Sequence, residues 1–350
     1  MKKYFGALAL LPGMVLIADT SPNPNTQAFQ FSADASFTYW YAKEDGLNIA
    51  ESSLLRPSGE AVFPPNISIF SQDFGYKPGF KLGLGLESTN QWNLHAEYTY
   101  YRGTTTTSKE APSNTSSLPA TGTWYVNEWF LQTLPLFKQS LSGTHISSTW
   151  KLGMDLGDIT FSRPYENDKG FCFSPFGGLR TVWIRQHMNI SLTQAAAAIG
   201  ASNLLPPQPL QSLNSSHSWA LGPRVGTEAK YGLPMGFRIE GLFAASLLYT
   251  QFTSIKHSEE RAATFITFPL QSSLHNYNCV RPVMDINLGL GWEMKLYQKY
   301  HIDFAASYDF SYFWGQNMMR SILDHLWEGS GSGDNDLYFQ GLTLTGSFRF

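Results

Sequence analysis

The chain ends in the stretch YFQGLTLTGSFRF, residues 338–350, in which large apolar and small polar side chains alternate. The apolar side chains share one parity, and the other parity carries Thr343, Thr345, Ser347 and Arg349. A period of two predicts a β-strand with one apolar and one polar face. Such an apolar face packs on a core in a water-soluble protein. In a transmembrane barrel it faces lipid, and the last strand closes the sheet so that no edge remains.

Nine further segments alternate in the same way: residues 29–41, 74–86, 92–100, 146–156, 171–183, 219–231, 237–249, 282–296 and 302–314. The parity of the first residue in each segment contains no Asp, Glu, Lys or Arg. The other parity, within the segments or directly beside them, carries Asp34, Lys77, Lys81, Glu87, Glu97, Lys151, Asp155, Arg180, Arg224, Glu228, Lys230, Arg238, Glu240, Arg281, Asp285, Glu293, Lys295, Asp303, Asp309 and Arg349. A charge at the middle of a bilayer costs roughly 2–4 kcal/mol, so an uncharged face is typical of contact with lipid. The segment 171–183 fits least well, because Phe176 and Val182 are apolar on its inner parity.

Aromatic residues mark many ends of the uncharged face, as expected at membrane–water interfaces. They are Tyr41, Trp92, Trp150, Trp183, Trp219, Trp292 and Trp314. Segments of about 11–15 residues, at ~3.3 Å per residue and a tilt of ~45°, are long enough to cross a membrane.

The connections between segments alternate in length. Long ones span residues 44–73, 102–145, 185–217, 251–280 and 315–337, and short ones span 88–91, 158–170, 232–236 and 297–301. The pattern predicts an all-β fold, a transmembrane antiparallel up-and-down β-barrel with long extracellular loops and short periplasmic turns. Ten strands fit best, and twelve result if two segments are split or missed. Residues 318–327 in the last loop predict a short amphipathic helix.

The N-terminus reads MKKYFGALALLPGMVLIADTS, with two lysines followed by an apolar run. This pattern predicts a secretory signal peptide over residues 1–18, cut between 18 and 20, and a single barrel domain over 19–350. Loss of Lys2 and Lys3 removes two positive charges and takes the formal charge from −3 to −5. The chain therefore has no basic footprint for nucleic acid. A mean hydropathy of −0.20 is compatible with a barrel, since half of each strand faces inward.

The inward charges are the candidate functional residues, as the lining of a pore: Lys77, Lys81, Glu97, Lys151, Asp155, Arg180, Arg224, Glu228, Arg238, Glu240, Asp285 and Asp303. They fit two readings. Internal salt bridges would fill a small barrel, because buried charges need partners, whereas basic and acidic walls would line a hydrated pore. Ten strands lie near the eight-stranded limit at which side chains fill the interior, which disfavours a wide pore and leaves a narrow one open.

The sequence offers little for catalysis. It has no HExxH, GxSxG or P-loop motif, and we expect no enzyme activity, no metal site and no cofactor. The weak alternative is a protease at the barrel rim that uses His145 or the pair Asp324–His325.

Two cysteines remain, Cys172 near a short turn and Cys279 in a long connection. The predicted topology puts them on opposite sides of the membrane, beyond the ~7 Å that a disulfide allows between Cα atoms. They are either inert thiols or sites of intermolecular cross-linking.

Three stretches carry a family resemblance: FSADASFTYWYAKEDGL (31–47), FCFSPFGGLRTVWIRQ (171–186) and GLTLTGSFRF (341–350). They resemble the major outer membrane proteins of Legionella and their relatives in environmental chlamydiae, including a P-x-x-G-x-R element at Pro175, Gly178 and Arg180. The resemblance implies an abundant, porin-like surface barrel that oligomerises, is sometimes cross-linked by disulfides and contacts host cells. With only two cysteines, extensive cross-linking is not expected here.

The leading hypothesis is a porin-like barrel in the bacterial outer membrane that passes small polar solutes or ions. The alternative is a surface-exposed adhesin or structural barrel whose long loops bind host molecules. The expected partners are outer-membrane lipid, further copies of the chain in a homo-oligomer, and host surface molecules.

Overall fold

The structure of the chain is a computed structural model. This structure describes residues 29–55, 61–62, 68–88, 92–110, 123–127, 129, 142–143, 145–167, 170–193, 198–199, 203–204, 209–261, 270–296, 300–328 and 335–350. The predicted leader, residues 1–18, lies outside the described residues.

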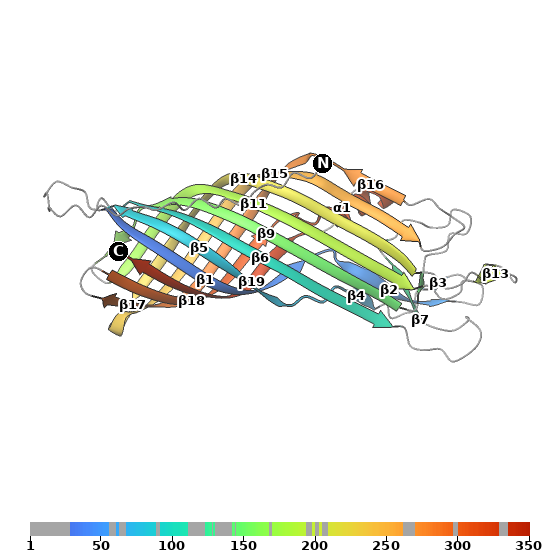
Figure 1. The fold of residues 1–350 in the computed structure, drawn as a ribbon, viewed down its shortest axis with the longest axis horizontal. Coiled ribbons are helices and arrows are strands. Elements are labelled where there is room, and N and C mark those ends of the chain that lie inside the picture. Colours follow the sequence, from blue (N-terminus) through green and yellow to red (C-terminus); the bar gives the residue numbers. More distant parts are fainter. Residues whose placement is uncertain are drawn as a thin grey trace, which may run out of the picture.

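Ten long antiparallel strands form a closed barrel (Figure 1). In ring order they are β1 (Phe29–Glu44), β5 (Tyr76–Ser88), β6 (Asn93–Glu110), β9 (His145–Ser162), β11 (Phe171–Thr193), β14 (Pro209–Gly232), β15 (Phe237–Arg261), β17 (Tyr277–Leu296), β18 (Tyr300–Phe313) and β19 (Leu337–Arg349). The first and last strands pair from Ser32 opposite Arg349 to Glu44 opposite Leu337, which closes the ring. The ten-stranded prediction and the role of the C-terminal stretch are confirmed. In the described part of the chain, no helix is long and apolar enough to span a membrane.

The barrel wall is uneven in height. Strands β11, β14 and β15 have 23, 24 and 25 residues, whereas β5 and β19 on the other side have 13 each. The long strands run on toward the end that carries the small strands β3 and β7 (Figure 1). The expected loops 102–145, 185–217 and 251–280 therefore start too early, since strand pairing continues well into each of them. Above the membrane, water meets the outer face, so these extensions need no apolar alternation and the sequence pattern does not mark them.

The remaining elements are short. A small sheet joins β2 (Asn48–Leu55), β3 (Ala61–Val62), β4 (Ile69–Ser71), β7 (Thr123–Asn127) and β8 (Ser142–Gly143). The others are β10 (Tyr165–Glu166), β12 (Ala198–Ile199), β13 (Asn203–Leu204), the 3₁₀ turn η1 (Pro234–Gly236), β16 (Leu270–Leu274) and the helix α1 (Met318–Glu328). Helix α1 confirms the helix expected at 318–327.

The outward face is apolar where lipid covers it. Leu84, Leu288 and Val225 are 69%, 65% and 60% exposed, which is reasonable only for side chains that meet hydrocarbon instead of water. The predicted inner parity of 171–183 is also correct, because Val182 and Arg180 are both buried inside.

The orientation predicted for residues 146–156 is wrong. Trp150, Leu152 and Met154 are at most 2% exposed and face the interior, while Lys151 and Asp155 face outward. Antiparallel partners share a face, and Asp155 lies opposite the outward-facing Trp183. Most of this segment lies above the membrane, where charges can face water on the outside and apolar side chains pack the inside. The rule that the uncharged face meets lipid therefore fails for this segment, and Trp150 is not part of the aromatic girdle.

Candidate functional site: the barrel lumen

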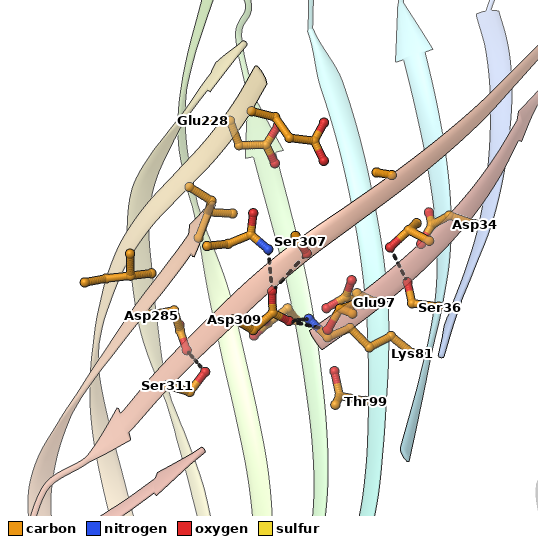
Figure 2. Close-up of a pocket in the computed structure, with 18 of the residues that line it drawn as sticks. Asp34, Ser36, Lys81, Glu97, Thr99, Glu228, Asp285, Ser307, Asp309 and Ser311 are labelled. Carbon is orange, nitrogen blue, oxygen red and sulfur yellow. Dashed lines mark hydrogen bonds and ion pairs between the residues drawn. The ribbon is translucent and has the colours of Figure 1, made fainter. Parts of the chain in front are cut away.

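The lumen holds a charged cavity in the membrane-spanning part of the barrel. Its volume is about 270 Å³, and side chains reach into it from strands all around the ring (Figure 2). Its walls include the predicted residues Lys81, Glu97, Arg180, Arg224, Glu228, Arg238, Glu240, Asp285 and Asp303. The structure thus brings together nine of the twelve candidates.

The other three candidates lie elsewhere. Lys77 lies on the inner parity of β5 opposite Trp40, four residues along the strand from Lys81, and is not among the residues that line the cavity. Lys151 and Asp155 were predicted to face the lumen and are on the outer surface instead, because the outer face of β9 meets water at their level.

The first of two networks that cross the lumen is built on two arginines. The Arg180 guanidinium donates to both carboxylate oxygens of Asp158 at 2.8 and 2.7 Å and to Asp285 at 2.7 Å. Arg224 donates to the same oxygen of Asp285, and the Ser311 hydroxyl donates to the other at 2.7 Å. Only 3% of Arg180 and 5% of Arg224 is exposed. Charge-assisted hydrogen bonds therefore link β9, β11, β14 and β17, with the Arg180–Asp158 pair bidentate, and the Ser311 hydroxyl adds β18.

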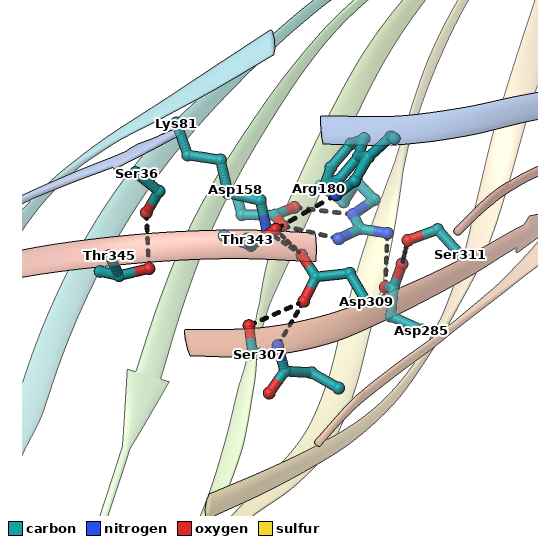
Figure 3. A network of polar contacts seen from close by, with 12 residues as sticks. Ser36, Lys81, Asp158, Arg180, Asp285, Ser307, Asp309, Ser311, Thr343 and Thr345 are labelled. Atoms are coloured by element: carbon teal, nitrogen blue, oxygen red, sulfur yellow. Dashed lines mark hydrogen bonds and ion pairs between the residues drawn. The ribbon is translucent and has the colours of Figure 1, made fainter. Parts of the chain in front are cut away.

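The second network centres on Asp309 (Figure 3). Its carboxylate accepts from the Lys81 ammonium at 3.0 Å, from the Thr343 hydroxyl at 2.8 Å and from the Ser307 hydroxyl at 3.2 Å. The Trp40 indole donates to the Thr343 hydroxyl at 3.1 Å, and the Lys81 ammonium lies 5.1 Å from the centre of the Trp40 ring. This network links β1, β5, β18 and β19.

Further ion pairs lie nearer the periplasmic end. Arg238 pairs with Asp303 and with Glu240, the latter at 2.8 Å. Smaller pairs are His95 with Asp34 at 2.9 Å, His301 with Glu293 at 2.8 Å and Lys230 with Glu228 at 3.4 Å. Most inward charges therefore have an opposite partner, as internal salt bridging predicts.

An apolar layer lies directly on the extracellular side of these networks. Leu156, Val182, Val283 and Phe313 are buried. Each lies two residues nearer the extracellular end of its strand than Asp158, Arg180, Asp285 and Ser311, respectively. Trp40, Tyr101 and Phe339 complete the layer, with ring centres 5.2–6.3 Å apart. All seven are at most 6% exposed and belong to one cluster of packed side chains. The layer draws side chains from seven of the ten barrel strands: β1, β6, β9, β11, β17, β18 and β19.

Helix α1 adds a further layer nearer the outer mouth. Met318 and Ile322 pack on Phe252 and Ile255 of β15, and Met319 and Leu323 join the larger apolar cluster. Arg320 and Asp324, one turn apart, form an ion pair at 2.8 Å. The helix thus seats its apolar face inside the barrel.

Sequence reasoning missed Asp158, and it recognised Asp309 as an inward charge without naming it as a site. Asp158 lies two residues beyond the predicted segment 146–156, on the parity that this segment assigned to lipid. Ile159 and Phe161 are 56% and 48% exposed and mark the true lipid face of β9. The alternation GDITF over 157–161 was the signal that could have placed Asp158 inside.

Both cysteines are unpaired and lie far apart, on β11 and β17. Cys279 is in a strand rather than in a loop, and packs beside Phe252 and Ile255. The Cys172 thiol lies 3.6 Å from the Ser174 hydroxyl. Both are partly buried on the inner parity, which favours inert thiols, and intermolecular cross-linking stays a prediction.

The sequence matches the family described as the Legionella pneumophila major outer membrane protein precursor over residues 20–350. The chain belongs to this family. It is therefore an outer membrane protein, and the predicted family resemblance and bacterial outer-membrane localisation are confirmed. No curated protein sequence matches it.

Several solved outer-membrane barrels are similar to this outer membrane protein at low identity. The outer membrane protease OmpT of Escherichia coli has 9% identity and a TM-score of 0.42, with 94% of this chain and 99% of that chain covered. A major outer membrane protein of Thermus thermophilus has 10% identity and a TM-score of 0.29, with 92% and 100% covered. The attachment invasion locus protein Ail of Yersinia pestis has 11% identity and a TM-score of 0.24, with 92% and 99% covered.

Proposed function

We propose that this outer membrane protein is a structural barrel that acts at the cell surface, with its extracellular strands and loops as the binding surface for host molecules. The observation that carries the proposal is the packed apolar layer that lies on the two buried ion-pair networks of the lumen. A solute that crosses this region must separate Arg180 from Asp158 and Asp285 and displace the packed aromatic rings. Breaking a buried ion pair costs about 3–5 kcal/mol, so the barrier to diffusion is high.

The shape of the wall supports the same proposal. Strands β11, β14 and β15 continue past the aromatic residues of the outer membrane interface, with Trp183 and Trp219 followed by at least ten further strand residues toward the extracellular end. A rigid interior of ion pairs and aromatic rings holds this projecting wall in place. The proposal includes self-association into a homo-oligomer and excludes catalysis. A rim protease would need the Asp324 carboxylate for catalysis, and this carboxylate already forms an ion pair with Arg320.

Planar-bilayer conductance of the purified protein tests the proposal. We expect no stable channel from the unmodified chain. The triple variant W40A/F313A/F339A removes three rings of the apolar layer and serves as the open control, because it shows that the assay detects a route through this lumen. Steady conductance of the unmodified chain that falls as the size of added solutes rises would overturn the proposal.

The surface role has its own test. Deletion of residues 111–122 or of 262–269 shortens one extracellular loop and leaves the paired strand residues in place. We expect weaker binding to host cells with unchanged folding, measured by the mobility of heated and unheated protein on gels. Equal binding by both deletion variants and by the full chain would contradict a role for these loops.

The second candidate function is a narrow porin-like route for small ions, and the cavity of about 270 Å³ favours it. The cavity is large enough for several water molecules. Eight carboxylates, among them Glu97 and Glu228, line it against five basic side chains, so a conducting form would favour cations. If channels appear, the variant E97Q/E228Q should reduce their cation preference. An unchanged preference would remove these two carboxylates from the route.

A further inference from the structure

The outer surface of the tall wall carries a cluster of cations. The hydrogen-bonded register places Arg102, Gly153, Arg185 and His217 in one row across β6, β9, β11 and β14. The next row toward the extracellular end contains Lys151, His187 and, on β15, Lys256. We call the side chains of Arg102, Lys151, Arg185, His187, His217 and Lys256 the basic patch.

Aromatic residues on the same strands indicate the level of the basic patch in the membrane. The row immediately below it contains Tyr100, Trp183 and Trp219, and the outward residues below that row include Tyr98, Leu221 and Tyr249. Aromatic residues of this kind lie at the interface between hydrocarbon and headgroups. Two residues along a strand tilted by ~45° rise about 5 Å and four residues about 10 Å, so the two rows of the basic patch lie about 5 and 10 Å beyond the aromatic row, in the headgroup region.

The patch faces outward and is strongly positive. The side chains of Arg102 and Arg185 are 35% and 54% exposed, and Lys151 and Lys256 are exposed. The two rows of the basic patch carry four permanent cations: Arg102, Lys151, Arg185 and Lys256. The nearest carboxylate in the register is Asp155, which lies in the aromatic row opposite Trp183.

The arginines are held in position in the unbound protein. Arg102 donates to the backbone carbonyls of Tyr101 at 2.7 Å and Met154 at 2.8 Å, and to Asp155 at 2.6 Å. Its guanidinium lies 4.3 Å from the Tyr100 ring centre, and a Cβ at position 153 would meet its side chain at 3.1 Å. Arg185 donates to the same carboxylate at 2.7 Å. Glycine at 153 thus leaves room for a guanidinium pair fixed side by side.

We propose that the basic patch binds the phosphate groups of a phosphorylated lipid of the outer leaflet, with its acyl chains on the apolar wall below. Guanidinium groups match phosphate oxygens with paired hydrogen bonds, and lysines add charge without fixed geometry. The apolar wall meets acyl chains through Leu221, Leu179 and Ile159, which are all outward and exposed. The opposite wall has no matching cluster among the described residues. There, Lys43 lies at the comparable height and pairs with Asp45 at 3.3 Å.

The test measures lipid binding to the full chain, folded in detergent, by native mass spectrometry. The probes are lipid A, its dephosphorylated form and inorganic pyrophosphate. The variant K151Q/R185Q/K256Q removes three cations of the patch, and K43Q/K109Q is the control with surface lysines outside it. Each cation near a membrane surface contributes measurably, so we expect roughly 10- to 100-fold weaker lipid A binding by the patch variant and no change in the control.

Three results would overturn the proposal: equal affinity of the patch variant, equal binding of dephosphorylated lipid A, or pyrophosphate binding as tight as lipid A binding. Equal losses in the patch variant and the control would also overturn it, because the attraction would then come from overall charge. If the triple variant does not fold, the single variants K151Q and K256Q replace it, since both side chains are exposed. Each should still weaken lipid A binding severalfold.

Discussion

Two carboxylates in this protein are each held by two arginines, in opposite surroundings. Asp285 lies inside the barrel between Arg180 and Arg224, whose side chains are 4% and 6% exposed. Asp155 lies on the outer surface between Arg102 and Arg185. The same three-residue arrangement links strands across the lumen in one place and presents charge to the membrane surface in the other. Solvent exposure, rather than the residue types, decides which role the arrangement takes.

The largest effect should come from breaking the inner arrangement. The substitution D285A leaves Arg180 and Arg224 buried without their shared partner, so we expect a loss of about 3–5 kcal/mol in the free energy of unfolding. Urea titration followed by tryptophan fluorescence in lipid vesicles measures it. A loss below about 1 kcal/mol would show that water reaches this network and that the lumen is more open than proposed.

The next effect concerns the two faces of β9 above the membrane. Leu152 is buried, so L152A should cost about 2–5 kcal/mol through lost packing and a cavity. Lys151 beside it is exposed, and K151A should change stability by no more than about 0.5 kcal/mol. The same titration compares the two variants. The opposite ranking would restore the strand orientation that the sequence pattern predicts.

A third carboxylate sharpens the comparison, because it is buried without any arginine. Glu44 lies at the extracellular end of β1, beyond Tyr41, and accepts a hydrogen bond from Gln186 at 2.6 Å. Complete burial raises its pKa to about 8, and the hydrogen bond from Gln186 opposes this only in part. The folded protein therefore binds a proton that the unfolded chain releases near pH 4.5.

The higher pKa of Glu44 in the folded state determines how the free energy of unfolding changes with pH. Stability should be greatest below about pH 4.5 as far as Glu44 is concerned, fall as the pH rises toward 8, and level off above it. The substitution E44Q should remove this slope and stabilise the protein at pH 8 by up to about 4 kcal/mol. Unfolding titrations at pH 5 and pH 8 measure both values. Equal pH slopes in E44Q and the unmodified chain would show that Glu44 is ionised in the folded state.

The smallest effect on stability should come from the outer arrangement. The substitution D155N breaks two ion pairs at the outer surface, where the Arg102 and Arg185 side chains are 35% and 54% exposed, and ion pairs at the surface contribute about 0–1 kcal/mol each. It also removes the carboxylate from the basic patch, so lipid A binding should become severalfold tighter while stability hardly changes. Native mass spectrometry and urea titration of the same sample test both parts. Weaker lipid binding would mean that Asp155 is needed to position Arg102 and Arg185.

The alternation in the sequence predicted the strands that lipid touches, because hydrocarbon tolerates no charge on the outward face. It placed Arg180, Arg224, Asp285 and Asp303 in the lumen for that reason alone. Above the membrane the constraint disappears, and β9 shows the consequence: Trp150 and Asp155 were assigned to the wrong faces. The basic patch was unreadable for the same reason, since its members lie in residues that the pattern treats as loop or as lumen.

The sequence by itself determined a ten-stranded barrel that spans the membrane and ends in its closing strand at Phe350. Period-two alternation over ten segments is a local property, and each strand carries its own part of it. Only the tertiary structure decided which inward charges pair across the lumen and that the outer wall carries the basic patch. Both depend on which residues of non-adjacent strands reach the same level, as Asp285 does with Arg180 and Lys81 with Asp309. That level is set by strand register and by the tilt of the closed barrel, which no single segment contains.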